Sequence, residues 1–177
     1  FLSEAKRNEI LVTVDNAGKD ALVHAALGGQ TEVVEIIEKE IKNAGLQRVV
    51  SVVKWLEEDI EKVLKLVREG NVICLKRLMD HELNLALQDP EKGYDLISTA
   101  CQVGNIDIID LLMSYDVDFT STSFEGATPL HFAVLHSEKP VLVHILTHAK
   151  AGSCRVSTDL LIKTDKNGDS PFHYAAR

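Results

Sequence analysis

The stretch GATPLHFAV, Gly126–Val134, decides the fold of this chain. A glycine, a threonine, a proline and a histidine stand there directly before a run of apolar residues. Thr128 is a good helix N-cap because its side-chain oxygen accepts an orphan backbone N–H. Pro129 suits the first helical position, where the missing N–H costs nothing. The stretch therefore predicts a glycine turn followed by a short helix, and it leaves His131 to be explained as catalytic or structural.

The pattern of this stretch recurs along the chain. GKDALVHAALGGQTEVVEII begins at Gly18, and GYDLISTACQVGNIDIIDLL begins at Gly93. A divergent copy, VLKLVREGNVICLKRLM, contains Gly70, and half a copy, GDSPFHYAAR, begins at Gly168. Neither half of such a unit can bury its apolar face alone, so consecutive units must stack.

Each unit is expected to contain two short helices. Asp20 and Asp95 occupy the cap position that Thr128 has in its own unit. Gly29 and Gly104 follow the first helix, where a residue in the left-handed conformation ends it. The second helices carry the branched aliphatic residues that fill the core.

TPLHFAV (Thr128–Val134) and SPFHYAA (Ser170–Ala176) resemble the T-P-L-H-x-A signature of the ankyrin-repeat family, and the step of about 33 residues agrees. The resemblance implies an all-α solenoid of stacked helix-turn-helix units with hairpin tips, with about four full repeats and partial repeats at both ends. It also implies that His131 hydrogen-bonds the backbone of the neighbouring turn. The divergent copy departs from the pattern, with Asp59 in place of the opening glycine and Val63 in place of leucine.

We expect one ankyrin-repeat domain over residues 1–177, as an excerpt of a longer array. Its parts are the tail of a preceding repeat (1–14), a repeat (15–45), an extra or lengthened helix (46–58), a divergent repeat (59–89), a repeat (90–122), a repeat with a long loop (123–164) and a truncated repeat (165–177). The tail is expected to end in an extended loop. The extra helix carries Trp55, which either packs on its neighbours or marks a partner site.

The composition narrows the class of protein. Apolar residues make up 45% of the 177 residues and aromatic residues 5%, which predicts a core of small and aliphatic side chains. A net charge of −8 disfavours nucleic acid, and no apolar run approaches the roughly 18 residues of a membrane span. Cys74, Cys101 and Cys154 match no metal or redox spacing, and the first two lie in apolar runs. We therefore expect buried thiols in an intracellular, cytoplasmic protein.

Three stretches offer candidate chemistry, and each has a plainer interpretation. HILTH places His144 and His148 one helical turn apart, but without further metal ligands we expect surface histidines. DKNGDSPFHYAA begins at Asp165 like a calcium loop, yet Ala176 stands where a bidentate glutamate is required, so we expect an Asn-Gly turn. His24 is interpreted as a packing residue. The sequence thus predicts no catalytic residue, cofactor or metal site, and no enzyme in this segment.

The resemblance implies instead a concave groove that binds partner proteins, formed by the turn tips and the exposed side of each first helix. By position, the tips supply Asn16, Lys19, Glu91, Lys92, Tyr94, Phe124, Glu125, Lys166 and Asp169, and the first helices supply Arg68, Gln102, Val103, Leu135 and His136. Tyr94 and Phe124 are the candidate anchors, because large aromatic residues suit that role. The alternative is that each packs against the next hairpin.

We therefore predict a protein–protein interaction module, part of a larger intracellular protein. Two alternatives stay open. The array could dock on an enzyme or channel domain of the same polypeptide and regulate it. The groove could also sense a small molecule or nucleotide, with Tyr94 and Phe124 stacking on it near Lys92.

Overall fold

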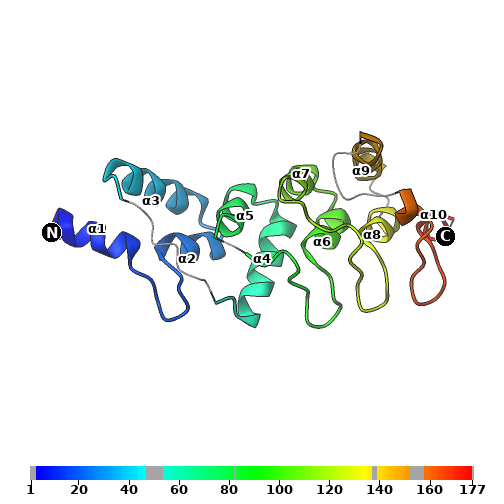
Figure 1. Cartoon of the computed structure of the whole chain (residues 1–177), viewed down its shortest axis with the longest axis horizontal. Coiled ribbons are helices and arrows are strands. Elements are labelled where there is room, and N and C mark those ends of the chain that lie inside the picture. Colours follow the sequence, from blue (N-terminus) through cyan, green and yellow to red (C-terminus); the bar gives the residue numbers. More distant parts are fainter. Residues whose placement is uncertain (1–2, 47–53, 82, 137–138, 152–157, 177) are drawn as a thin grey trace. The chain divides into compact units, whose positions relative to one another are not determined.

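The computed structural model describes residues 3–46, 54–81, 83–136, 139–151 and 158–176 (Figure 1). The chain divides into two compact units. Unit 1 consists of Phe1–Leu66 and Asn71–Asn84, and unit 2 consists of Val67–Gly70 and Leu85–Arg177. Within the described residues, no helix has the length and the apolar character that a membrane crossing requires.

Unit 1 is built from helices around a small aliphatic core. In order they are α1 (Glu4–Val12), α2 (Ala21–Leu27), α3 (Thr31–Asn43), α4 (Glu57–Glu69, whose last residues belong to unit 2) and α5 (Val72–Met79). Helix α2 packs against both α3 and α5. The centre of this packing is formed by fully buried side chains, among them Leu22, Val34, Leu64 and Leu75.

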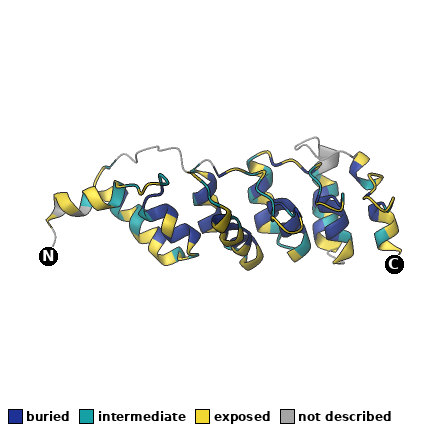
Figure 2. Ribbon diagram, turned by 90° about the horizontal axis from the view of Figure 1, so that it is seen from below, coloured by how far each residue is buried: buried dark blue, intermediate teal, exposed yellow. Residues whose placement is uncertain are grey.

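Unit 2 repeats a helix-turn-helix arrangement. Its elements are α6 (Leu96–Val103), α7 (Ile106–Ser114), α8 (Pro129–Leu135), α9 (Lys139–Ala151), the 3-10 helix η1 (Thr158–Leu161) and α10 (Pro171–Ala175). Helices α6, α8 and α10 pack side by side, while α7 and α9 form a second layer (Figure 1). Buried residues gather on the inner sides of the helices and exposed residues on the outer sides (Figure 2).

Local signals fix where these helices begin and end. The Asp20 carboxylate accepts the Val23 N–H at 2.9 Å, and the Asp95 carboxylate accepts the Ser98 N–H at 2.8 Å. Helix α6 ends at Gly104, whose φ of 80° is left-handed. The caps predicted at Asp20 and Asp95 and the helix-ending glycine at Gly104 are therefore confirmed.

Backbone hydrogen bonds join the turn tips of unit 2 to one another. The Phe124 N–H donates to the Lys92 carbonyl at 3.0 Å, and the Lys166 N–H donates to the Glu125 carbonyl at 2.9 Å. Each tip is thus held by the tip of the preceding repeat. In Figure 1 the three tips project from the layer of α6, α8 and α10, on the side away from α7 and α9.

Gly93 shows how closely two tips approach. Its φ is +70°, and a Cβ there would lie 2.5 Å from Phe124 Cδ1 and 2.8 Å from the Phe124 backbone nitrogen. We expect Gly93→Ala to lower the free energy of unfolding by about 2 kcal/mol, because it combines backbone strain with a clash against backbone. Gly168→Ala is the control, since Gly168 has a φ of +83° with nothing within 4 Å of its Cβ position. Urea unfolding should show a loss of about 1 kcal/mol there, and equal losses for both variants would contradict the close approach.

Two segments differ from the expected structure. The prediction of an extended loop before the first turn is wrong, because Glu4–Val12 forms the helix α1, with Ser3 as its N-cap. In the helix expected over 46–58, residues 47–53 lie outside the described residues and Lys54–Leu56 are not helical. Helix α4 begins at Glu57, so Leu56 is its N-cap residue. The Leu56 N–H donates to the Asp59 carboxylate at 2.9 Å, as in one half of a capping box.

Two further expectations concern buried side chains. Cys74 and Cys101 are buried free thiols, as predicted, and Cys154 lies outside the described residues. Trp55 is half-buried, and its buried indole N–H has no acceptor among the described residues. Whether Trp55 packs only on its neighbours or also contacts a partner stays a prediction.

Candidate functional site

The ends of the first helices in unit 2 leave apolar side chains exposed. Val103 closes α6 with 42% of its surface exposed, and Leu135 closes α8 with 54% exposed. Gln102 is half-buried, and His136, directly after α8, is exposed. Gln102 and Val103 precede Leu135 and His136 by one repeat, so the two pairs occupy equivalent positions on helices that pack side by side. Arg68, near the end of α4, is also exposed.

The two candidate anchors on the tips have different surroundings. The Phe124 ring lies against Gly93 of the neighbouring tip and keeps 47% of the residue exposed. Tyr94 is half-buried, and its ring meets the buried Phe132 ring edge-on, with centroids 4.6 Å apart. Lys92 Nζ lies 5.7 Å from the centre of the Tyr94 ring. Phe124 therefore has the more accessible aromatic face, while Tyr94 contributes mainly to packing.

The remaining predicted tip residues carry charges of both signs. Glu91, Lys92, Glu125 and Lys166 are exposed. Asp169 is half-buried. Asn16 is exposed on the tip of unit 1. We call the residues on unit 2 the tip–helix surface: Phe124, Val103 and Leu135 at its apolar positions, and Arg68, Glu91, Lys92, Gln102, Glu125, His136 and Lys166 at its polar positions.

The expectation that Lys19 is exposed for a partner is wrong. Lys19 is 4% exposed, and its Nζ lies 2.5 Å from Oδ2 of Asp59, which is 1% exposed. The pair is internal to unit 1 and holds the tip that precedes α2 against the start of α4. The signal in the sequence was Asp59 itself, which stands where the other units have a glycine. Lys19 is therefore no part of a binding surface.

His131 has the structural role expected from the resemblance. The residue is fully buried, and its Nδ1 accepts the Thr128 N–H at 3.1 Å. Nε2 therefore carries the proton and donates to the Asp169 carbonyl of the next tip at 3.0 Å. Burial lowers the pKa of His131, and the opposing effect of the Asp169 carbonyl is smaller. A neutral, doubly hydrogen-bonded ring of this kind ties two repeats together.

Two other candidates for chemistry, Asp165 and His24, each pair with a neighbouring residue of their own repeat. Asp165 Oδ1 accepts the N–H groups of Asn167 and Asp169, and Oδ2 accepts the Tyr174 hydroxyl at 2.8 Å. Burial raises the pKa of Asp165, but these hydrogen bonds lower it by more. The interpretation of His24 as a packing residue is wrong, because its side chain is 56% exposed and its Nε2 lies 2.9 Å from Asp15 Oδ2.

The structure brings together one cluster that the sequence did not reveal. Asp110 of α7 lies beside His144 and His148 of α9, and the three side chains offer ligand atoms within 4.8 Å of one another. The sequence showed only the two histidines, because the carboxylate comes from the preceding repeat. Since Asp110 stands about one repeat before His144, comparing the second helices of consecutive units would have pointed to it.

Comparison with known proteins agrees with this architecture. The family model for ankyrin repeats (three copies) matches residues 63–154, more than half of the chain. The chain is similar to the 2-5A-dependent ribonuclease of Mus musculus, with 30% identity over 91 residues, or 51% of this chain. It is also similar to the nuclear factor NF-kappa-B p105 subunit of Gallus gallus, with 25% identity over 121 residues, or 68% of this chain. The matched regions span 12% of the length of each relative. The all-α solenoid class predicted from the sequence is confirmed, and the chain belongs to the ankyrin-repeat family.

Proposed function

We propose that unit 2 binds a partner protein through the tip–helix surface. Ankyrin repeats are generally protein-interaction modules and are typically non-catalytic. The observation that carries the proposal is the exposure of Phe124, Val103 and Leu135 on consecutive repeats, at 47%, 42% and 54%. Apolar side chains that a partner can bury, together with exposed polar residues on the same tips and helix ends, match the usual composition of a protein interface.

The rigidity of the surface supports binding. Backbone hydrogen bonds link its tips, at 3.0 Å between Phe124 and Lys92 and at 2.9 Å between Lys166 and Glu125. Less conformational entropy is therefore lost when a partner orders these residues. Charges of both signs on the tips, in a chain of net charge −8, favour a protein with complementary charges over nucleic acid.

We infer that the segment acts by binding, as part of a larger intracellular protein. The relatives are much longer than the matched region, which is 12% of each. Docking on an enzyme or channel domain of the same polypeptide would use the same surface, with an intramolecular partner.

One observation favours a second candidate function, the sensing of a nucleotide. One relative is named a 2-5A-dependent ribonuclease. In this chain Lys92 Nζ lies 5.7 Å from the Tyr94 ring centre, which places a cation beside an aromatic ring near the exposed Phe124. A saturable rise in melting temperature with an oligoadenylate, lost in Lys92→Ala, would favour this function over protein binding.

The test of protein binding is a quantitative pull-down from cell lysate. Leu135→Asp combined with Val103→Asp places charges in the apolar positions, and we expect it to reduce retention of specific partners at least tenfold. Ile162→Asp is the matched control, because Ile162 is 69% exposed and lies outside the tip–helix surface. Partners that are retained by the wild type and by the control, but not by the double variant, support the proposal. Equal retention by all three proteins contradicts it, provided that circular dichroism shows equal folding.

A further inference from the structure

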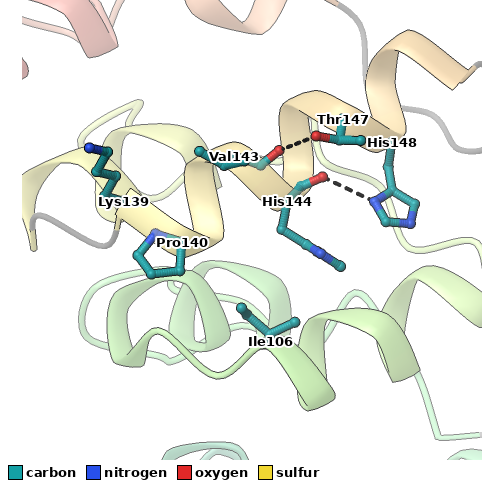
Figure 3. A pocket seen from close by; sticks show the side chains of 7 residues that line it. All are labelled: Ile106, Lys139, Pro140, Val143, His144, Thr147 and His148. Atoms are coloured by element: carbon teal, nitrogen blue, oxygen red, sulfur yellow. Dashed lines mark hydrogen bonds between the residues drawn. The ribbon is translucent and has the colours of Figure 1, made fainter.

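The second layer of unit 2, formed by α7 and α9, contains two histidines of α9 that face α7. His144 and His148 are one turn apart on α9, with ring centroids 4.5 Å apart. Figure 3 shows both rings projecting from the side of α9 that faces α7. They border an open cavity of about 520 Å³, which is also lined by Ile106, Pro140 and Val143.

Asp110 on α7 completes a set of three potential ligands. Its Oδ1 lies 2.5 Å from His144 Nε2, and its side chain is 50% exposed, while that of His144 is 22% exposed. The ligand atoms of Asp110, His144 and His148 all lie within 4.8 Å of one another. Bonds of about 2.1 Å to a tetrahedral ion place ligand atoms about 3.4 Å apart, so separations of up to 4.8 Å would have to shorten for the three to share an ion.

The hydrogen bonding of His148 leaves one nitrogen ready for a metal. Its Nδ1 lies 3.0 Å from the His144 carbonyl oxygen, which can only accept, so Nδ1 carries the proton (Figure 3). Nε2 therefore keeps its lone pair. A backbone carbonyl that fixes the tautomer in this way is typical of histidines that bind metals.

We propose that Asp110, His144 and His148 form a zinc site that links α7 to α9. Two imidazoles and a carboxylate are ligands that suit Zn²⁺, an ion with no geometric preference of its own from d-electrons. Three protein ligands leave a fourth position for water or for a side chain of a bound partner. Zinc there joins the second helices of two consecutive repeats on the layer away from the tips, so this site is separate from the tip–helix surface and does not depend on it.

The experiment measures Zn²⁺ binding by the whole chain, freed of metal with a chelator, in competition with a chromophoric indicator. We expect one tight ion per chain in the wild type. His148→Gln, His144→Gln and Asp110→Asn should each weaken its binding at least tenfold, because loss of even a group that only supports a ligand typically weakens metal affinity about 10–100-fold. His24→Gln is the matched control, since His24 also lies beside a carboxylate, at 2.9 Å from Asp15 Oδ2, with no third ligand in the described residues.

The cysteines are unchanged in every variant, so differences between variants report on the cluster. Ring-nitrogen NMR gives a second readout, in which Zn²⁺ should shift the resonances of His144 and His148 and leave that of His24 in place. The proposal is overturned if the wild type and His148→Gln bind Zn²⁺ equally, or if His24→Gln weakens binding as much as the cluster variants. Undiminished affinity in Asp110→Asn would also overturn it, because the histidine pair alone would then account for the binding.

Discussion

Replacing Lys19 with methionine is expected to lower the free energy of unfolding by about 3 kcal/mol. The Lys19 ammonium is 4% exposed and pairs at 2.5 Å with Asp59, which is 1% exposed. Removing the lysine leaves the buried Asp59 carboxylate with only the half-exposed Lys62 as a more distant counter-charge, which is far less favourable than the intact pair. Urea unfolding followed by circular dichroism measures the difference.

Two controls separate the buried pair from general effects of charge. Lys62 Nζ lies 3.7 Å from Asp59 Oδ1, but its side chain is 48% exposed, so Lys62→Met should lower stability by less than about 1 kcal/mol. Lys19→Met combined with Asp59→Leu removes both charges of the buried pair, and most of the lost stability should return. Losses of similar size from Lys19→Met and Lys62→Met would show that the Lys19 pair is not buried.

His131→Ala is expected to lower the free energy of unfolding by about 2–3 kcal/mol. The ring is fully buried, and its loss leaves the buried Thr128 N–H without its acceptor and removes one of the two hydrogen bonds to the Asp169 carbonyl, which also accepts the Asp165 N–H. The variant also removes the edge-on contact with Tyr174, whose ring centroid is 5.1 Å away. His173→Ala is the matched control, because His173 caps α10 in the same way through Ser170 but is exposed. His173→Ala should lower the free energy of unfolding by less than about 1 kcal/mol. If His173→Ala lost more stability than His131→Ala, the role of His131 in linking two repeats would be contradicted.

The pH dependence gives an independent check on His131. Burial lowers the pKa of His131 in the folded state below its unfolded value of about 6.5, so the unfolded chain binds the proton more readily. This histidine therefore contributes stability above about pH 6.5, and the contribution is lost as pH falls through that value toward the folded-state pKa. Between about pH 7 and pH 5 the wild type should lose more stability than His131→Ala.

The sequence predicted the backbone of the repeats well because the signals are local. Asp95 caps α6 and Thr128 stands before α8, as their positions in the repeat require, and Gly104 ends α6 in the left-handed conformation. His131 was also predictable, because a repeated unit implies a neighbouring turn at a fixed place. Such features depend on contacts within one repeat or at a constant offset of one repeat.

Side-chain contacts that differ from one repeat to the next could not be predicted in this way. Lys19 was assigned to the surface by its position, but its partner Asp59 is peculiar to the divergent copy. For Tyr94 the sequence left open whether the ring is an exposed anchor or packs on its neighbours, and the structure shows Phe132 of the next repeat against part of the ring. Asp110 joins His144 only because two outer helices pack side by side, and neither stretch indicates this alone.

The most direct test of the proposed protein binding is a site-specific photo-crosslink. A photoreactive amino acid is placed at Leu135 of the tip–helix surface, or at the exposed control position Ile162, and the protein is illuminated with the partner from the pull-down. We predict a covalent adduct at Leu135 that excess unlabelled wild type abolishes, and little adduct at Ile162. An adduct at Ile162 with none at Leu135 would contradict binding through the tip–helix surface.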